Sequence, residues 1–321
     1  MQFCILGPVE IFDKECRNRI VPPGKNQRAL LATLVIKAGQ VMSTDRLINE
    51  LWGVNPPTTA VNSLQATVAR LRRLMDTSQP EADDWAILTQ ESGYLMRPGR
   101  ERTDADRFVE LSDQGRAMVA VDPGRAVPLL RQALDVWRGP ALEDAVCGDI
   151  CATFAIQFTE RRLAVLETLY YANLRLGRHH DIVAELEGLV GEHPFRERFH
   201  DLLMVALYRS GRQAEALSVY ERLRTRLARE LGLEPSPALQ RRVLDVLNRE
   251  VELDGAGPPR RGAAFWPDQE ADVTNSIISG LFHEVGHLRH RLEVLTREHN
   301  ALFDRLDGML PALGGSKGGG K

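Results

Sequence analysis

The sequence predicts a mainly α-helical fold with a small β component. Three observations predict this fold class: a helix-spaced apolar stripe in residues 58–75, short strand-like runs before and after it within the first 100 residues, and a nearly uninterrupted helical pattern over residues 160–248. The composition, 43% hydrophobic and 26% charged, is ordinary for a globular protein. At 321 residues the chain is expected to hold two or three domains, each with a core of its own.

The net charge of −3 is unevenly distributed along the chain. Residues 1–100 carry a net +2, and the remainder carries −5. This balance argues against a wholly basic nucleic-acid binder, and it fits a DNA reader whose cations are concentrated on one helix. The pattern of a signal peptide is not recognised in the sequence, and neither is an apolar run near the length of about 18 residues that a membrane span needs, so neither feature is expected. We therefore expect a cytoplasmic, nucleoid-associated protein without membrane contact.

The first 60 residues predict a small sheet followed by two helices. The strand-like runs 2–6, 9–12 and 19–21 predict an antiparallel sheet. Helices are expected over residues 28–37 and 45–52, with the second capped by residues 43–45 and closed by Gly53. Residues 55–57, Asn-Pro-Pro, predict a rigid turn before the next helix, which Thr58 or Thr59 would cap.

Residues 58–75 predict an amphipathic helix with an unusual polar face. The predicted buried stripe is Val61, Leu64, Val68, Leu71 and Met75. The opposite face is small, amide-bearing or guanidinium-bearing, with no acidic residue before Asp76. Amides bind an adenine edge in two places, and arginine does the same to guanine. The alternative is an ordinary surface helix whose basic last turn suits the helix dipole.

Residues 86–89 and 94–97 predict a β-hairpin with glycine at its turn. The resulting order of sheet, three helices and hairpin is typical of a winged helix-turn-helix.

At this point the residues resemble a known family. Residues 44–47 (TDRL), 51–53 (LWG), 64–73 and 92–94 (SGY) are similar to the response-regulator type of winged helix, and more narrowly to the Streptomyces antibiotic regulatory proteins. The resemblance continues through residues 103–108 (TDADRF), 137–142 (WRGPAL) and 229–237 (RELGLEPSP), which look like the bacterial transcriptional activation domain of that family. It covers about residues 1–250.

An internal repeat supports this second domain. Leu176-Gly177-Arg178 returns as Ser210-Gly211-Arg212 after 34 residues, and Leu169 and Ala172 return as Leu203 and Ala206. Thirty-four residues is the tetratricopeptide period. We therefore expect stacked helix pairs with turns at the two glycines.

The predicted organisation is a winged helix-turn-helix over residues 1–100, tetratricopeptide-like repeats over 101–252, a linker over 253–272, a coiled-coil-like helix over 273–310 and a flexible tail over 311–321. Apolar residues occupy heptad positions a and d of the coiled-coil-like helix, with His299 as a polar exception. The alternative is a helix that folds back onto the repeats.

Enzymatic chemistry is not expected. Residues 283–287 match H-E-x-x-H, but the heptad frame places both histidines outside the seam and too few residues surround them for a cleft. A phosphate-binding loop is missing from the sequence, and Cys147 and Cys151 are interpreted as reduced structural thiols because no matched ligands lie nearby. We predict no catalytic residue, no cofactor and no metal site.

The resemblance implies a transcriptional activator, pathway-specific for antibiotic or other secondary-metabolite synthesis. It would bind direct repeats near the −35 promoter element as adjacent, self-associating protomers and recruit RNA polymerase through its σ factor. The turn of residues 53–57, with Gly53, Val54 and Asn55, would contact the polymerase. An alternative is a helical-repeat adaptor without direct DNA readout.

The implied DNA contacts fall into three groups. Residues at the helix start would hold phosphates, Ala66 and Arg70 would face bases, and the others would reach flanking phosphates or grooves. The complete set is Thr58, Thr59, Asn62, Ser63, Gln65, Ala66, Thr67, Arg70, Arg72, Arg73, Tyr94 and Arg97.

Overall fold

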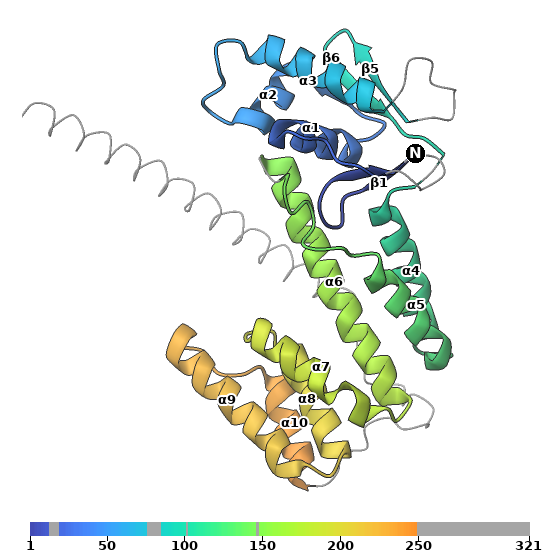
Figure 1. Cartoon of the computed structure of the whole chain (residues 1–321). Coiled ribbons are helices and arrows are strands. Elements are labelled where there is room, and N and C mark those ends of the chain that lie inside the picture. The colour runs from blue at the N-terminus through green and yellow to red at the C-terminus, as the bar shows by residue number, and fades with distance from the viewer. Residues whose placement is uncertain (13–18, 76–84, 101, 146–147, 249–321) are drawn as a thin grey trace, which may run out of the picture. The chain divides into compact units, whose positions relative to one another are not determined.

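The computed structural model describes residues 1–12, 19–75, 85–100, 102–145 and 148–248, and these belong to one compact unit (Figure 1). It confirms a mainly helical fold with small β-sheets. The expected linker, the coiled-coil-like helix with its H-E-x-x-H motif, the tail and Cys147 lie outside the described residues.

The chain begins with a three-stranded antiparallel sheet. Strands β1 (Gln2–Cys4), β2 (Glu10–Phe12) and β3 (Arg19–Ile20) pair in sequence order, and Phe3 lies opposite Ile11. Both of these side chains are buried. The sheet forms as expected, with strands one or two residues shorter than the apolar runs.

Three helices follow the sheet: α1 (Lys25–Ile36), α2 (Thr44–Trp52) and α3 (Ala60–Leu74). The Ser43 hydroxyl accepts a hydrogen bond from the Arg46 N–H, which confirms the predicted cap of α2. Thr59 occupies the N-cap position of α3, but its hydroxyl makes no capping hydrogen bond. The first helix begins three residues earlier than predicted, after Gly24, which offers no side-chain capping signal.

A second three-stranded sheet forms the wing. Strand β4 (Val41–Ser43) pairs with β6 (Gly93–Arg97), which pairs in turn with β5 (Ala86–Gln90). A Cβ atom on Gly93 would lie 2.0 Å from the Met42 carbonyl oxygen. Glycine is therefore required here by the close approach of β4.

The rest of the described chain is helical. Helices α4 (Asp104–Met118), α5 (Pro123–Asp135) and α6 (Asp149–Arg175) come first, and the C-terminal part of α6 begins the first repeat. They are followed by α7 (His179–Glu192), α8 (Glu197–Arg209), α9 (Gln213–Leu231) and α10 (Pro237–Asn248).

The two repeat turns have the same backbone conformation. Gly177 and Gly211 have φ of 74° and 77°, a region that favours glycine, and both follow the C-terminus of a helix. In each turn the next residue donates its backbone N–H to a carbonyl in the last turn of the helix. Ala172 and Ala206 are both fully buried, as are Leu169 and Leu203 to within 1%. The 34-residue repeat is thereby confirmed.

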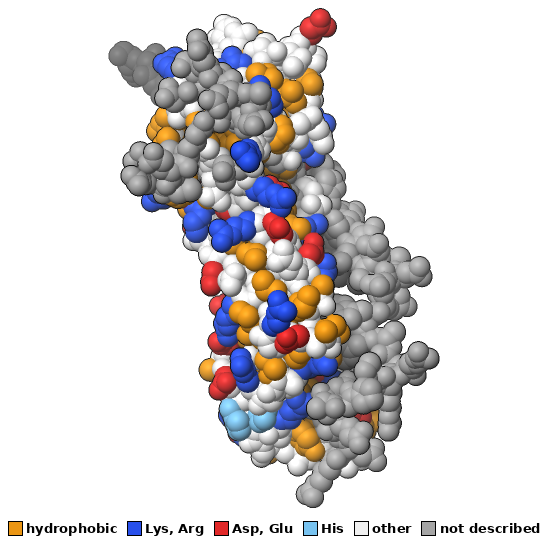
Figure 2. Space-filling view, turned by 90° about the vertical axis from the view of Figure 1, so that its right-hand side faces the viewer, with side chains coloured by type: hydrophobic (Ala, Val, Ile, Leu, Met, Phe, Trp, Pro, Cys, Tyr) orange, Lys and Arg blue, Asp and Glu red, His pale blue; other side chains and the backbone are white. Residues whose placement is uncertain are grey.

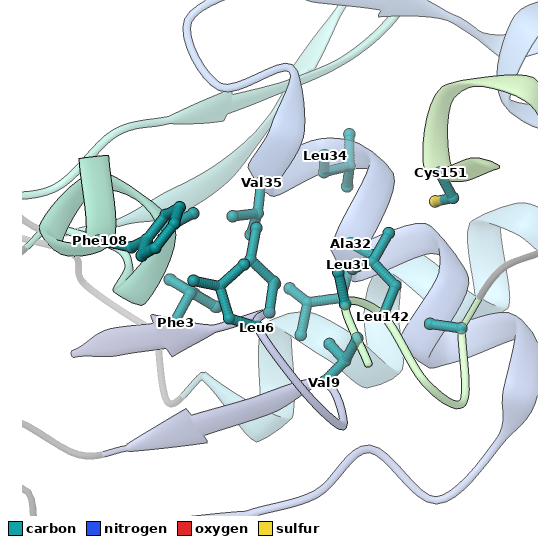
Figure 3. Close-up of a cluster of buried hydrophobic side chains, with 14 of the residues drawn as sticks. Phe3, Leu6, Val9, Leu31, Ala32, Leu34, Val35, Phe108, Leu142 and Cys151 are labelled. Atoms are coloured by element: carbon teal, nitrogen blue, oxygen red, sulfur yellow. The ribbon is translucent and has the colours of Figure 1, made fainter. Parts of the chain in front are cut away.

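The winged-helix part and the first helices after it share a single core. Phe3 and Val9 from the first sheet region belong to the same buried cluster as Leu31 of α1, Phe108 of α4 and Cys151 of α6, and Figure 3 shows where these side chains lie. A second core lies among α6 to α10. The winged-helix part and helices α4 to α6 are therefore built around one hydrophobic core, although the chain changes from mixed to purely helical structure near residue 100.

A buried polar network accompanies this shared core. The Asp104 carboxylate, 3% exposed, accepts hydrogen bonds from the backbone N–H groups of Ile5 and Leu6 at 2.8 and 2.9 Å. Arg138 donates to Asp104 at 3.3 Å and also pairs with Glu10. Burial raises the pKa of Asp104, and these donors oppose the rise. The carboxylate thus joins the segment directly after β1 to α4.

A second carboxylate joins α2 to α6. Glu50, 4% exposed, accepts hydrogen bonds from the backbone N–H groups of Ile150 and Cys151 at 3.1 and 3.0 Å. These N–H groups lie in the first turn of α6, where the helix dipole also favours negative charge. A Cβ on Gly148 would lie 2.5 Å from the Glu50 carboxyl group, so glycine permits this approach.

We predict that Asp104→Asn destabilises the shared core by about 1–3 kcal/mol, because the new amide places a donor against backbone N–H groups that need an acceptor. Chemical denaturation of the whole chain, followed by tryptophan fluorescence, measures this, since Trp85 and Trp137 lie in that core. The matched control is Asp113→Asn at an exposed Asp113–Arg116 pair, expected to change stability by less than about 0.5 kcal/mol. Equal effects of the two substitutions would contradict the role of Asp104.

Candidate nucleic-acid interface

One face of α3 is exposed and lacks acidic residues. Its exposed side chains recur at helical spacing: Asn62, Gln65, Ala66, Arg70 and Arg73. The opposite side buries Leu64, Val68 and Leu71 in the shared core. Thr58 and Thr59 are exposed at the helix start, where free backbone N–H groups suit a phosphate. The small side chain of Ala66 leaves the helix backbone accessible.

The two arginines on this face differ from most arginines elsewhere on the protein. Among the described residues, neither Arg70 nor Arg73 has an ion-pair or hydrogen-bond partner. On the helical part, by contrast, Arg116 pairs with Asp113 and Arg131 pairs with Glu185. The face in Figure 2 likewise shows Lys and Arg side chains interspersed with Asp and Glu. The cations on α3 thus remain available to an external anion.

Two predictions at the edge of this helix are wrong. Val61 was expected in the buried stripe, but it is 48% exposed, and Ala60 is buried instead. Thr67 was expected on the DNA-facing side, but it is 6% exposed and donates its hydroxyl hydrogen to the Ser63 carbonyl at 2.7 Å. Ser63 itself is half-buried. The boundary between the buried and exposed faces of α3 is therefore shifted by about one residue from the predicted boundary.

Arg72 contacts the wing. Its Nε donates to the Ile87 carbonyl and its Nη2 donates to the Thr89 hydroxyl, both at 2.9 Å. These bonds join the last turns of α3 to β5. Arg72 therefore holds the hairpin, a role that the sequence prediction did not include, and its predicted DNA contact stays a prediction. The sequence contains no signal that distinguishes Arg72, which bonds to the wing, from the neighbouring Arg73, which does not.

The wing residues also differ from expectation. Tyr94 is 8% exposed and belongs to the shared core, so its ring does not project toward a groove. Arg97 is half-buried and pairs with Ala86 at the end of the hairpin opposite its turn. The exposed tip consists of residues 90–92, Gln-Glu-Ser, in the turn that the sequence predicted, although these residues were not named among the DNA contacts. Their position at a turn between two strands was the signal in the sequence that they would be exposed at the tip of the wing.

The turn between α2 and α3 is exposed throughout residues 53–59. Gly53 ends α2 with φ of 62°, and Val54 is 76% exposed. The residues that the resemblance assigns to the polymerase contact, Gly53, Val54 and Asn55, therefore lie on an exposed turn just before α3. This exposure leaves them accessible to another protein, and their role stays a prediction.

The described residues contain no group of three or more metal-ligating side chains that could hold an ion. The same part of the chain includes no helix that is both long and apolar enough to span a membrane.

Comparisons with known proteins agree with this architecture. Residues 18–96 match the family described as transcriptional regulatory protein, C terminal, and residues 103–247 match the bacterial transcriptional activator domain. The transcriptional regulator RedD of Streptomyces coelicolor is 41% identical, with 86% of this chain and 77% of RedD covered. The regulatory protein DnrI of Streptomyces peucetius is 35% identical, with 82% of this chain and 98% of DnrI covered.

A solved structure shows the same fold. Mycobacterium tuberculosis EmbR, in complex with a low-affinity phosphopeptide, is similar with a TM-score of 0.71 and 31% sequence identity. The match covers 77% of this chain and 65% of the EmbR chain, so this protein spans less than two thirds of that relative. Sequence and fold agree that the chain belongs to the Streptomyces antibiotic regulatory proteins, a family of transcriptional activators and not of enzymes.

Proposed function

We propose that α3 enters the major groove of promoter DNA and reads its sequence there. The observation that supports this most directly is the exposed, acid-free face of α3 with two unpaired arginines. In this proposal Arg70 binds a guanine edge, Gln65 and Asn62 contact base edges or phosphates, and Ala66 packs near a thymine methyl. Arg73, Thr58 and Thr59 bind phosphates, with Ser63 at the margin.

We further propose that protomers bind adjacent direct repeats and recruit RNA polymerase through its σ factor, in genes for antibiotic or other secondary-metabolite synthesis. Family membership supports this target class. The Glu50 contact to α6 and the Asp104 contact to Ile5 support a fixed orientation between the proposed DNA-reading helices and the helical part. Self-association through residues 273–310 is part of the proposal, and these residues lie outside the described ones.

We predict that Arg70→Ala and Arg73→Ala weaken DNA binding in different ways. Arg70→Ala should cost about 1–3 kcal/mol and relax base preference at one position in each repeat, because it removes a base contact. Arg73→Ala should weaken binding to all sequences alike and reduce the salt slope by about one unit, because it removes a phosphate contact. Titrations on the wild-type promoter and on single-base variants at several salt concentrations measure both effects.

The control is Arg116→Ala, at an exposed arginine of α4 that pairs with Asp113. It should leave binding and its salt dependence unchanged. If Arg70→Ala behaves like this control, α3 does not read the groove. A wild-type chain without salt-dependent promoter binding would favour the adaptor alternative.

Arg72→Ala should lower the free energy of unfolding by about 1–2 kcal/mol, because two hydrogen bonds between α3 and β5 are lost. Its salt slope for DNA binding should equal that of the wild type. Arg73→Ala provides the comparison at the next position, with unchanged stability and an altered slope. A reversed pattern for these two variants would show that Arg72 binds phosphate and that its contacts to the wing are dispensable.

Val54→Glu tests the proposed polymerase contact. Val54 is 76% exposed, so the substitution should leave stability unchanged. DNA affinity is measured in parallel, and transcription is compared at DNA saturated with protein, because the new carboxylate lies near the proposed phosphate contacts of Thr58 and Thr59. Activated transcription with purified polymerase should fall by about tenfold, equivalent to about 1.4 kcal/mol of lost contact. Val121→Glu, at a valine 82% exposed between α4 and α5, is the control and should transcribe normally. Equal transcription by both variants would exclude the turn as a contact.

A further inference from the structure

Val61 is an exposed apolar residue on a helix whose other fully exposed side chains are small or polar. It lies in the first turn of α3, and it is 48% exposed. Its neighbour Ala60 is 6% exposed and supplies the buried position at the start of the helix. Val61 does not belong to the shared core. The DNA contacts proposed above do not include it.

Neither helix formation nor the core favours a valine at this position. A β-branched side chain loses rotamer freedom in a helix, so valine is a weaker helix former than alanine or a long polar residue. An apolar side chain that stays half in water also contributes little through burial. A partner that covers the side chain would account for this residue type, and the partner proposed for the exposed face of α3 is DNA.

Val61 lies on one flank of the exposed face of α3. At about 100° per residue, Val61 and Gln65 lie on the same flank, and Arg70 lies on the opposite one. Asn62 and Ala66 lie between the two flanks, and all five residues are exposed. A recognition helix contacts base edges with its N-terminal residues. The apolar group that bases present in the major groove is the C5-methyl group of thymine. It projects toward the backbone side of the base, so a residue on a flank of the helix can reach it.

We propose that Val61 is a specificity-determining residue that packs on the C5-methyl group of a thymine in each DNA repeat. This inference rests on the proposed entry of α3 into the major groove. Val61 and Gln65 are about 6 Å apart along the helix axis, and successive bases of a strand are about 3.4 Å apart. The thymine therefore lies about two base pairs from the position that Gln65 contacts. Val61 and Arg70 thus read different base pairs, one through a methyl group and the other through hydrogen bonds.

The test removes the methyl group without changing base pairing. The full-length chain first selects its binding site from random double-stranded DNA, and each thymine of the selected duplex is then replaced singly by uracil, which lacks the C5-methyl group. Fluorescence anisotropy measures the dissociation constants. Uracil at the thymine that Val61 contacts should weaken binding about fourfold, the effect of losing one buried methyl-sized group. A selected site without a thymine at a fixed position, or without a thymine that responds to uracil, would overturn the proposal.

Val61→Ala assigns the response to this residue. The variant should bind the selected duplex about fourfold more weakly, and uracil at that thymine should then have no further effect, because both changes remove the same contact. Val121→Ala, at an exposed valine between α4 and α5, is the matched control and should keep the full response. A thymine that faces Ala66 should also still respond in the Val61→Ala variant. If this variant and the wild type respond equally at every thymine, Val61 does not contact a methyl group.

The arginine variants separate this proposal from the proposed function. If Arg70→Ala and Arg73→Ala weaken binding as predicted while Val61→Ala keeps every thymine response, α3 reads the groove without Val61. If both arginine variants bind like Arg116→Ala, α3 does not enter the groove, and the Val61 contact is excluded with it. The response to uracil is a ratio of two affinities of one protein sample, so a change in folded fraction does not alter it.

Discussion

The buried carboxylate of Asp104 is the interaction on which the arrangement of this protein depends. It satisfies the backbone N–H groups of Ile5 and Leu6, next to Arg138, at a place where the first strand meets α4. A carboxylate this buried is tolerated because donors and a cation surround it, and removing either side leaves an uncompensated charge or an unsatisfied donor. The first sheet and the helical part are therefore stable in one relative position.

That position has a consequence for DNA-dependent regulation. Glu50 lies on α2, which packs on α3, and it caps α6, which extends into the second core (Figure 1). Helix α3 is thus linked to the helical part by hydrogen bonds and by a shared apolar core. Under the function proposed above, this link would hold the helical part in one orientation relative to the DNA that α3 binds.

The sequence alone determined the features that depend on local spacing. The 3.6-residue period placed Leu64, Val68 and Leu71 inside α3, Ser43 marked the start of α2, and the 34-residue offset located both repeat turns. Only the tertiary structure decided what Thr67, Arg72 and Tyr94 do, because their positions lie at the margin between faces. Which part of the chain packs against each of these three side chains depends on contacts between separate elements, and the periodicity of a single helix or strand carries no information about such contacts. The same holds for Asp104, whose partner Ile5 lies 99 residues away.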